Sequence, residues 1–286
     1  MSLQVWIDGK LVDKERAAVS VYDHGLLYGD GVFEGIRLYS GRIFRPEAHL
    51  RRLFDSAKAI RLNIPFTAQQ LTAAIYETAK VNKLSDCYVR LVVTRGVGAL
   101  GIDPAKCATP SVFIITDLIA VYPKEAYQNG VSVIVSSIVR THPNALSPRI
   151  KSLNYLNNVL ARIEATDAGV PDAIMLNHLG NVSECTVANI FLTRDGMVFT
   201  PTLSEGILEG VTRNVIIELC REMDIPVRER IVERHDLYIS DECFLTGSGA
   251  EVMPVTKIDN RPVGNGDVGP ITKRLMEAFH KHVRGS

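Results

Sequence analysis

Amphipathic helical segments alternate with short β-branched runs along the chain, and this alternation limits the possible fold more than any other feature. From Pro46 onward, Leu50, Leu53, Phe54 and Ala57 lie on one helical stripe, and the proline stands at a favoured first-turn position. Runs rich in valine and isoleucine further along are typical of strands. The chain is therefore expected to be a mixed α/β protein, and the absence of a repeating period argues against a solenoid.

The same patterns predict elements in both halves of the chain. They are a hairpin around Asp8–Lys10, a strand near Ala18–Tyr22, a helix over Ala68–Asn82, strands over Cys87–Arg95 and Ser111–Asp117, a strand from Val131, a helix near Tyr155–Ala168, a hairpin around His178–Asn181, a helix after Gly210 and a helix near Ile271–His282. Gly96–Pro110 is rich in glycine and proline, which predicts a functional or flexible loop.

A length of 286 residues favours two domains over one. Composition shifts across residues 118–130, where Pro123, Asn129 and Gly130 precede a new apolar strand. We therefore expect an N-terminal α/β domain over residues 1–117, a linker over 118–130 and a C-terminal domain over 131–286.

Charge excludes several classes of partner. Lys+Arg and Asp+Glu both number 32, and no block of like charges offers a surface for nucleic acid or a membrane. No stretch approaches the roughly 20 apolar residues that cross a bilayer. A small-molecule partner is favoured.

The cysteines indicate the cellular compartment, and the histidines indicate whether a metal site is expected. The 5 cysteines are scattered without a C-x-x-C pair, so reduced cytosolic thiols fit best. The first residues lack the apolar core of a signal peptide, which also favours the cytoplasm. The histidines show no metal-ligand spacing, so no metal site is expected.

Lys151 stands between a proline-containing loop and an amphipathic helix, a junction from which a side chain can point into a cleft. Covalent chemistry with a carbonyl needs a partly neutral amine, which desolvation and nearby cations favour. Glu184 lies in a predicted strand among small and apolar residues, where a carboxylate could hold a proton on a heteroaromatic nitrogen. Most lysines and glutamates at such positions are simply solvated, so position alone identifies neither.

Three further places could bind an anion. Val211 and Thr212 open a helix after Gly210, and free N–H groups at a helix start suit a phosphate. Ser248 lies in a glycine turn that could present N–H groups and a hydroxyl. Arg52 falls opposite the apolar stripe of its helix, so it is either solvated or directed at a cleft, where a guanidinium can grip phosphate.

Tyr88 and Arg90 are two residues apart in a predicted strand and therefore point to one face, while Cys87, Val89 and Leu91 point to the other. The pattern fits a binding face and an exposed outer face equally well.

Taken together, these stretches resemble the class IV aminotransferases, and most closely the branched-chain amino acid aminotransferases. The resemblance spans nearly the whole chain and rests on ordered segments: YDHGLLYGDGVFEGIR, RLFDSAK, YVRLVVTRGVGALGIDP, IKSLNYLNNVLARIEA, VSECTVANIF, LEGVTRNVI and LTGSGAEVMPV. It implies a two-domain enzyme of fold type IV, with a smaller N-terminal α/β domain, a larger C-terminal pseudo-barrel domain and pyridoxal 5'-phosphate between them.

The resemblance also implies roles for individual residues. Lys151 would hold the cofactor covalently and act as the general base, and Glu184 would pair with the pyridine nitrogen. The other implied cofactor contacts are Arg52, Val211, Thr212 and Ser248 at the phosphate, Leu208 behind the ring and Tyr155 at the phenolic oxygen. The implied substrate contacts are Tyr28, Phe33, Tyr88, Arg90, Gly249 and Ala250.

The implied reaction is ping-pong transamination of L-leucine, isoleucine and valine with 2-oxoglutarate, with Arg90 accepting the distal carboxylate of an acidic substrate. The Gly96–Asp103 loop could close over the pocket, and Tyr122 could add a further wall. A homodimer or higher homo-oligomer is implied, with a partner subunit completing the pocket.

The sequence departs from the family pattern at CTVAN and at Ser248. KSLN without a following tyrosine occurs in D-amino acid aminotransferases, whereas Tyr155 and the Tyr88/Arg90 pair of this chain favour the L-branched-chain group. A D-amino acid or (R)-amine transaminase and an aminodeoxychorismate lyase therefore stay open as alternatives, because a shared fold does not fix the function.

Overall fold

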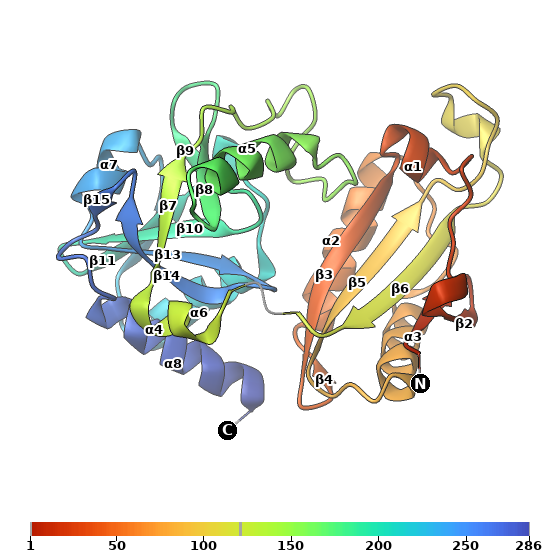
Figure 1. The fold of residues 1–286 in the computed structure, drawn as a ribbon, viewed down its shortest axis with the longest axis horizontal. Helices are drawn as coiled ribbons and strands as arrows, with labels where there is room; N and C mark the ends of the chain where they lie inside the picture. Colours follow the sequence, from red (N-terminus) through yellow and green to blue (C-terminus); the bar gives the residue numbers. More distant parts are fainter. Residues whose placement is uncertain (1, 120–121, 286) are drawn as a thin grey trace. The chain divides into compact units, whose positions relative to one another are not determined.

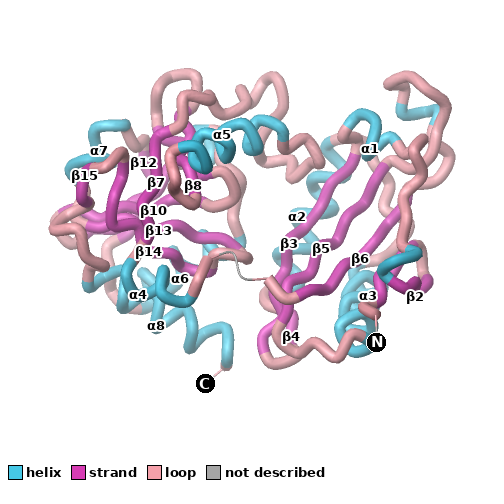
Figure 2. Tube along the Cα trace, in the orientation of Figure 1, coloured by secondary structure: helices cyan, strands magenta, loops and turns pink. Residues whose placement is uncertain are grey.

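The structure is a computed structural model, and it describes residues 2–119 and 122–285. The chain divides into two compact units, Met1–Ile119 with Ile150–Asn154, and Ala120–Arg149 with Tyr155–Ser286 (Figures 1 and 2). The domain limits drawn from composition stay a prediction. Helix α4 (Lys124–Asn129) lies within the range expected to be a linker, and Lys151 lies in the segment that belongs with the first unit.

The first unit is built on an antiparallel sheet of six strands. In spatial order these are β2 (Lys10–Asp13), β1 (Gln4–Ile7), β6 (Ser111–Asp117), β5 (Cys87–Thr94), β3 (Gly31–Tyr39) and β4 (Arg42–Ile43). Helices α2 (Pro46–Ala59) and α3 (Ala68–Val81) cover one face of the sheet (Figure 1). The short helix α1 (His24–Tyr28) and the 3-10 turns η1 (Lys14–Arg16) and η2 (Pro104–Lys106) lie in its connections.

Local sequence explains why the two helices begin where they do. Pro46 occupies the first turn of α2, where its missing N–H costs nothing. Thr67 and Gln70 form a capping box at the start of α3, because each side chain accepts a hydrogen bond from the other residue's backbone N–H (3.2 and 2.8 Å). The helices bury Leu53, Leu71 and their neighbours against the sheet.

One predicted strand is wrong. Residues Ala18–Tyr22 form no strand, and most of their side chains are exposed. The strand of this region is β3, which pairs with β5 along its length and, at its end, with the two-residue edge strand β4. The other predicted helices, strands and hairpins are confirmed within a few residues.

The second unit contains a nine-stranded mixed sheet. Its path runs β12 (Val227–Arg230), β11 (Met197–Pro201), β10 (Asn189–Arg194), β13 (Glu242–Gly247), β14 (Glu251–Ile258), β7 (Val131–Val135), β8 (Asp172–Leu176) and β9 (Val182–Cys185), with β15 (Arg261–Pro262) beside β14. The sheet curls until β9 lies near β10, where the Cys185 N–H donates to the Ala188 carbonyl (2.8 Å). This is the pseudo-barrel that the resemblance implies.

Helices cover the curled sheet. Besides α4 they are α5 (Leu156–Asp167), α6 (Val211–Glu222), α7 (Arg234–Ile239) and α8 (Pro270–Arg284), with a 3-10 turn η3 at Leu203–Glu205. α6 and α8 pack on each other and on β13. The two units have separate hydrophobic cores, as expected of independent domains.

Candidate active site

The backbone around Lys151 is fixed to the first unit's sheet. The Phe33 N–H donates to the Lys151 carbonyl (3.0 Å), and the Leu153 N–H donates to the Gly31 carbonyl (2.9 Å). The Lys151 N–H in turn donates to the hydroxyl of Ser56 on α2 (3.1 Å). Lys151 is therefore a half-buried residue laid along β3, and the ordinary solvated loop lysine is ruled out.

The Lys151 side chain lies over an aromatic ring, with Nζ 4.5 Å from the centroid of Phe33. The guanidinium carbon of Arg90 lies 4.3 Å from the same centroid and 5.6 Å from that of Tyr88. Cations this close to a ring are attracted by its π face. The aromatic face of the sheet thus gathers two cationic groups beside Tyr88, which is the face predicted from the strand alternation.

A buried carboxylate lies one residue further along β3. Glu34 has no exposed surface and accepts two hydrogen bonds from Arg52, from Nε to Oε1 and from Nη2 to Oε2 (both 2.7 Å). Arg52 is only 13% exposed, so the solvated alternative for it is wrong. His49, on the same helix face, contacts Oε2 through Nδ1 (2.7 Å).

Tyr28 contacts the loop after β5, apart from this aromatic face. It ends α1 and is 37% exposed, and its hydroxyl accepts a hydrogen bond from the Gly101 N–H (2.9 Å). His24 of the same helix contacts the loop as well, because its Nε2 lies 3.0 Å from the Ala99 carbonyl, which can only accept a hydrogen bond. α1 therefore anchors the Gly96–Asp103 loop.

Glu184 of β9 is the centre of the second unit's polar cluster. Its Oε1 accepts hydrogen bonds from Arg140 Nε and Nη2 (3.1 and 2.8 Å), and its Oε2 accepts from Asn189 Nδ2 and the Leu208 N–H (3.1 and 3.0 Å). The side chains of Glu184 and Arg140 are 6% and 9% exposed. Asn158 of α5 fixes Arg140 from its other side (3.2 Å). Glu184 is thus buried and held, and the solvent-facing alternative is wrong.

Helix α6 begins beside this cluster. Gly210, its N-cap residue, has no side chain because a Cβ there would collide with the amide of Asn189. Gly210 supplies no side-chain cap, and the N–H groups of Val211 and Thr212 lie in the first turn, where they have no partner within the helix. By contrast, the start of α8 is bound by the carboxylate of Glu242, which accepts from the Thr272 N–H (2.7 Å). The start of α6 can therefore bind an anion.

Four further cofactor and substrate candidates, Ser248, Gly249, Ala250 and Tyr155, lie in the second unit. Ser248 and Gly249 form the turn between β13 and β14, and β13 pairs with β10 at Asn189. The Ala250 carbonyl accepts from the hydroxyl of Tyr127 (3.2 Å). Tyr155 is the N-cap residue of α5, three residues before Asn158.

Comparisons with known proteins agree with this chemistry. The pattern of the family described as amino-transferase class IV matches residues 31–258. The chain belongs to the class IV aminotransferases.

Within this family, the chain is similar to proteins named branched-chain aminotransferases. A putative branched-chain-amino-acid aminotransferase of Methanocaldococcus jannaschii is 48% identical over 277 residues, which cover 97% of this chain and 95% of the relative. The crystal structure of the Escherichia coli branched-chain amino acid aminotransferase superposes with a TM-score of 0.96 at 36% identity and covers 100% of this chain and 96% of its own. The branched-chain aminotransferase of Thermoproteus uzoniensis with norvaline gives 0.93 at 38% identity, covering 100% and 96%. The resemblance found in the sequence is confirmed.

Four residues of this aminotransferase's polar clusters escaped the sequence analysis: Glu34, His49, Arg140 and Asn189. His49, Arg52 and Ser56 share one face of α2, so a polar stripe at helical spacing was a signal available for His49. Glu34 was the one charged residue within the segment Gly31–Ile36. Arg140 and Asn189 left no local signal.

Tyr122 packs in the interior of the second unit. It is 4% exposed in the second core, and its hydroxyl donates to the buried Asp172 (3.4 Å). Burial and the neighbouring carboxylate raise the pKa of Tyr122 far above its usual range. Tyr122 is therefore a core residue.

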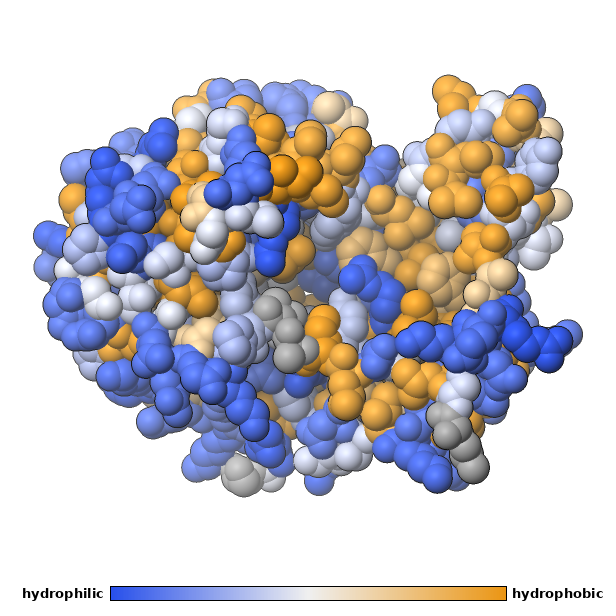
Figure 3. All heavy atoms as spheres, viewed as in Figure 1, coloured by the Kyte–Doolittle hydropathy of each residue, from blue (hydrophilic) through white to orange (hydrophobic). Residues whose placement is uncertain are grey.

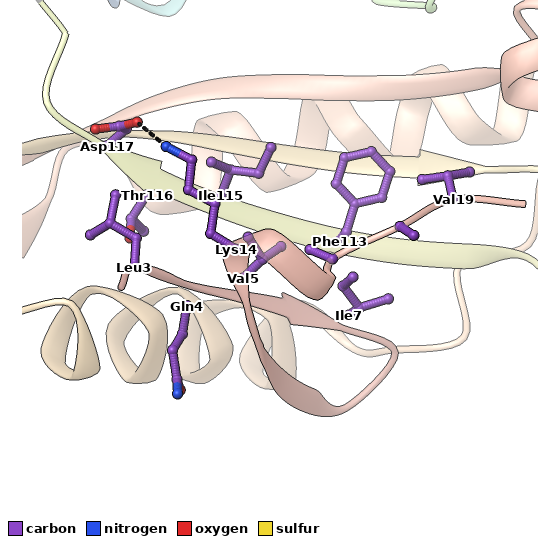
Figure 4. A pocket seen from close by; sticks show the side chains of 12 residues that line it. Leu3, Gln4, Val5, Ile7, Lys14, Val19, Phe113, Ile115, Thr116 and Asp117 are labelled. Carbon is purple, nitrogen blue, oxygen red and sulfur yellow. Dashed lines mark ion pairs between the residues drawn. The ribbon is translucent and has the colours of Figure 1, made fainter. Parts of the chain in front are cut away.

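A cavity of about 230 Å³ in the first unit contains none of the candidate residues (Figure 4). It lies between β1, the segment after η1 and β6, and its walls are mostly apolar, including Val5, Phe113 and Ile115. Lys14 and Asp117 pair at its edge with Nζ and Oδ2 3.9 Å apart, and both are more than half exposed. An ion pair this exposed contributes little to the stability of the fold.

Over residues 2–119 and 122–285, no helix combines the length and apolar character needed to span a membrane. Within the same residues, no group of histidine, cysteine, aspartate and glutamate side chains is arranged to hold a metal ion.

Proposed function

We propose that this chain transfers the amino group of L-leucine, isoleucine and valine to 2-oxoglutarate in a ping-pong reaction, with pyridoxal phosphate as its cofactor. The observation that supports the proposal most is the half-buried Lys151 amine over Phe33, next to a buried carboxylate that grips Arg52. The names of the relatives point to the same reaction, and one related branched-chain aminotransferase was solved with pyridoxamine 5'-phosphate.

The donor set fits pyridoxal phosphate chemically. Arg52, the N–H groups of Val211 and Thr212, and Ser248 would hold the phosphate. Leu208 would lie behind the ring and Tyr155 at its phenolic oxygen. Glu184 would accept the N–H of the pyridine nitrogen, since its carboxylate is already fixed by Arg140 and Asn189.

When bound, pyridoxal phosphate supplies a ring that withdraws electrons from the substrate carbon next to the amino group. The chain's own residues do the rest. The Lys151 amine takes the proton from that carbon, and Glu184 keeps the ring nitrogen protonated, which strengthens the withdrawal.

Substrate choice would depend on the aromatic face of the first unit. Phe33 and Tyr88 of this face, together with Tyr28 of α1, would contact the branched side chain, and Gly249 and Ala250 would bind the α-carboxylate. Arg90 would accept the distal carboxylate of glutamate, which would let one site take both apolar and acidic substrates.

A panel of amino donors and 2-oxo acid acceptors followed by chiral analysis tests this proposal. Turnover of L-leucine with 2-oxoglutarate supports it. Preference for D-alanine or an (R)-amine would assign the chain to the alternative transaminases, and turnover of aminodeoxychorismate without a 2-oxo acid would make it a lyase.

Gly35 offers a test of the substrate face. It pairs with Arg90 across β3 and β5, and a Cβ at Gly35 would overlap the Tyr88 hydroxyl and lie 2.9 Å from Tyr88 Cζ. Gly35→Ala should therefore displace Tyr88, raise KM for L-leucine about tenfold and lower the free energy of unfolding by roughly 1–3 kcal/mol. Steady-state kinetics and denaturant unfolding measure the two effects.

Tyr88→Phe removes the oxygen that the new methyl group would meet. Adding Gly35→Ala to Tyr88→Phe should consequently cost less than adding it to the wild type. Equal costs in the two backgrounds would show that Gly35 does not make room for the Tyr88 hydroxyl.

We also propose a homodimer or higher homo-oligomer, and the cytoplasm as the compartment. α1 and the loop after β5 expose large apolar side chains: Leu26 64%, Val97 54%, Leu100 65% and Ile102 82%. Figure 3 shows hydrophobic residues over this part of the first unit. Apolar groups gathered on a surface usually mark an interface. The free cysteines support a reducing compartment.

Ile102→Asp should dissociate the oligomer, because a charge at an apolar interface loses its hydration without gaining a partner. Light scattering after size-exclusion chromatography measures the mass. Leu179→Asp, at a 71% exposed hairpin residue, should leave the mass unchanged. An unchanged mass for Ile102→Asp would exclude this surface as the interface.

A further inference from the structure

The carboxylate of Glu34 is the most deeply buried charge beside Lys151, and the proposed reaction gives it no task. Its side chain projects from β3 and has no exposed surface. Two side chains of α2 contact it. Arg52 binds both of its oxygens, and His49 binds Oε2. All three groups belong to the first unit.

The cluster has one negative and one positive charge. Burial alone would raise the pKa of Glu34, but the charge of Arg52 and the contacts with His49 outweigh it and lower the pKa to about 2. Burial lowers the pKa of His49, so its ring is neutral near pH 7 and Nδ1–H donates to Glu34. The contact between His49 and Glu34 is therefore a hydrogen bond within an arginine–carboxylate pair.

Stability is a poor reason for burying such a pair. Removing two charges from water is costly, and apolar side chains of similar volume often join two elements as well or better. What the pair provides is geometry, because two parallel hydrogen bonds fix the plane of a guanidinium that would otherwise rotate about several bonds. His49 Nε2 is also buried without a hydrogen-bond partner among the described residues, as in sites that a ligand or its water completes.

We propose that Glu34 is a positioning residue for the cofactor phosphate: it holds the Arg52 guanidinium in place before the phosphate arrives, and His49 holds the second oxygen of Glu34. The inference rests on the proposed function, from which it takes the role of Arg52. A group fixed in advance loses less freedom on binding, so the benefit should appear in the affinity for phosphate.

Pyridoxal is the discriminating probe, because it keeps the aldehyde that reacts with Lys151 but lacks the phosphate. The affinities of the cofactor-free full chain for pyridoxal phosphate and for pyridoxal are measured by fluorescence titration. Glu34→Gln should weaken binding of pyridoxal phosphate about tenfold or more and leave pyridoxal binding nearly unchanged. Equal weakening of both would mean a merely structural role and would overturn the inference.

A matched pair of variants tests His49. His49→Asn keeps a donor near the position of Nδ1 and should retain most of the preference for the phosphate form, whereas His49→Leu removes the donor and should lose part of it. Asp23→Asn is the control for the loss of a buried carboxylate, since Asp23 caps α1 within the same unit. It should not change the preference, and the same loss in Asp23→Asn would contradict the inference.

Arg52→Gln separates this inference from the proposed function. If Arg52→Gln loses the preference for the phosphate form and Glu34→Gln does not, Glu34 has no positioning role while Arg52 keeps its own. If Arg52→Gln keeps the preference for the phosphate form, the assigned contact of Arg52 with the phosphate fails, and so does the positioning role of Glu34 that depends on it. Should circular dichroism show that Glu34→Gln does not fold, the His49 pair decides, and equal preference in the two variants overturns the inference.

Discussion

Lys151→Ala is expected to lower the rate of amino transfer from L-leucine to 2-oxoglutarate by at least about 10⁴-fold, because the side chain is both the covalent attachment and the base. The fold should survive. The three hydrogen bonds that fix this segment use the backbone of Lys151 and Leu153, and alanine keeps them all. The rate is measured with purified protein and excess cofactor, and the fold by circular dichroism and thermal unfolding.

Lys58→Ala is the matched control, since Lys58 is exposed in the last turn of α2. Its rate should equal that of the wild type. Adding methylamine to Lys151→Ala should restore part of the activity by replacing the missing amine, which attributes the loss to chemistry. Turnover of Lys151→Ala at the wild-type rate would refute the assigned role of Lys151.

The sequence predicted most elements because most of them expose one face. Leu50, Leu53 and Ala57 repeat at helical spacing in α2, and Cys87 and Val89 alternate with half-buried residues in β5. β3 lacks such a pattern because both of its faces are covered: its first six residues, Gly31–Ile36, are all buried. With two glycines and a glutamate in a stretch that does not alternate, no local rule indicated a strand.

The site was predictable only in part, for a related reason. Lys151, Glu184 and Arg52 were recognised through ordered segments of sequence, but their partners come from elsewhere in the fold. The partner of Arg52 is Glu34, on the strand that no pattern predicted. The partner of Glu184 is Arg140, 44 residues earlier in the chain, and only the curled sheet brings the two together. Long-range pairs of this kind follow from topology.

Glu184→Gln is expected to have the second largest effect, and on two separate quantities. The rate should fall roughly 10²- to 10³-fold, because the neutral amide no longer stabilises a proton on the ring nitrogen. The free energy of unfolding should also fall by about 3–5 kcal/mol, because Arg140 is left as an uncompensated charge that is only 9% exposed. Single-turnover kinetics and denaturant unfolding measure the two separately.

A second substitution distinguishes the chemical role of Glu184 from its structural one. In Glu184→Gln with Arg140→Leu the buried charge is gone, so much of the lost stability should return. The rate should stay low, because the leucine restores packing and supplies no negative charge near the ring nitrogen. If the rate recovered together with the stability, Glu184 would be needed only to balance Arg140, and its assigned contact with the cofactor would be wrong.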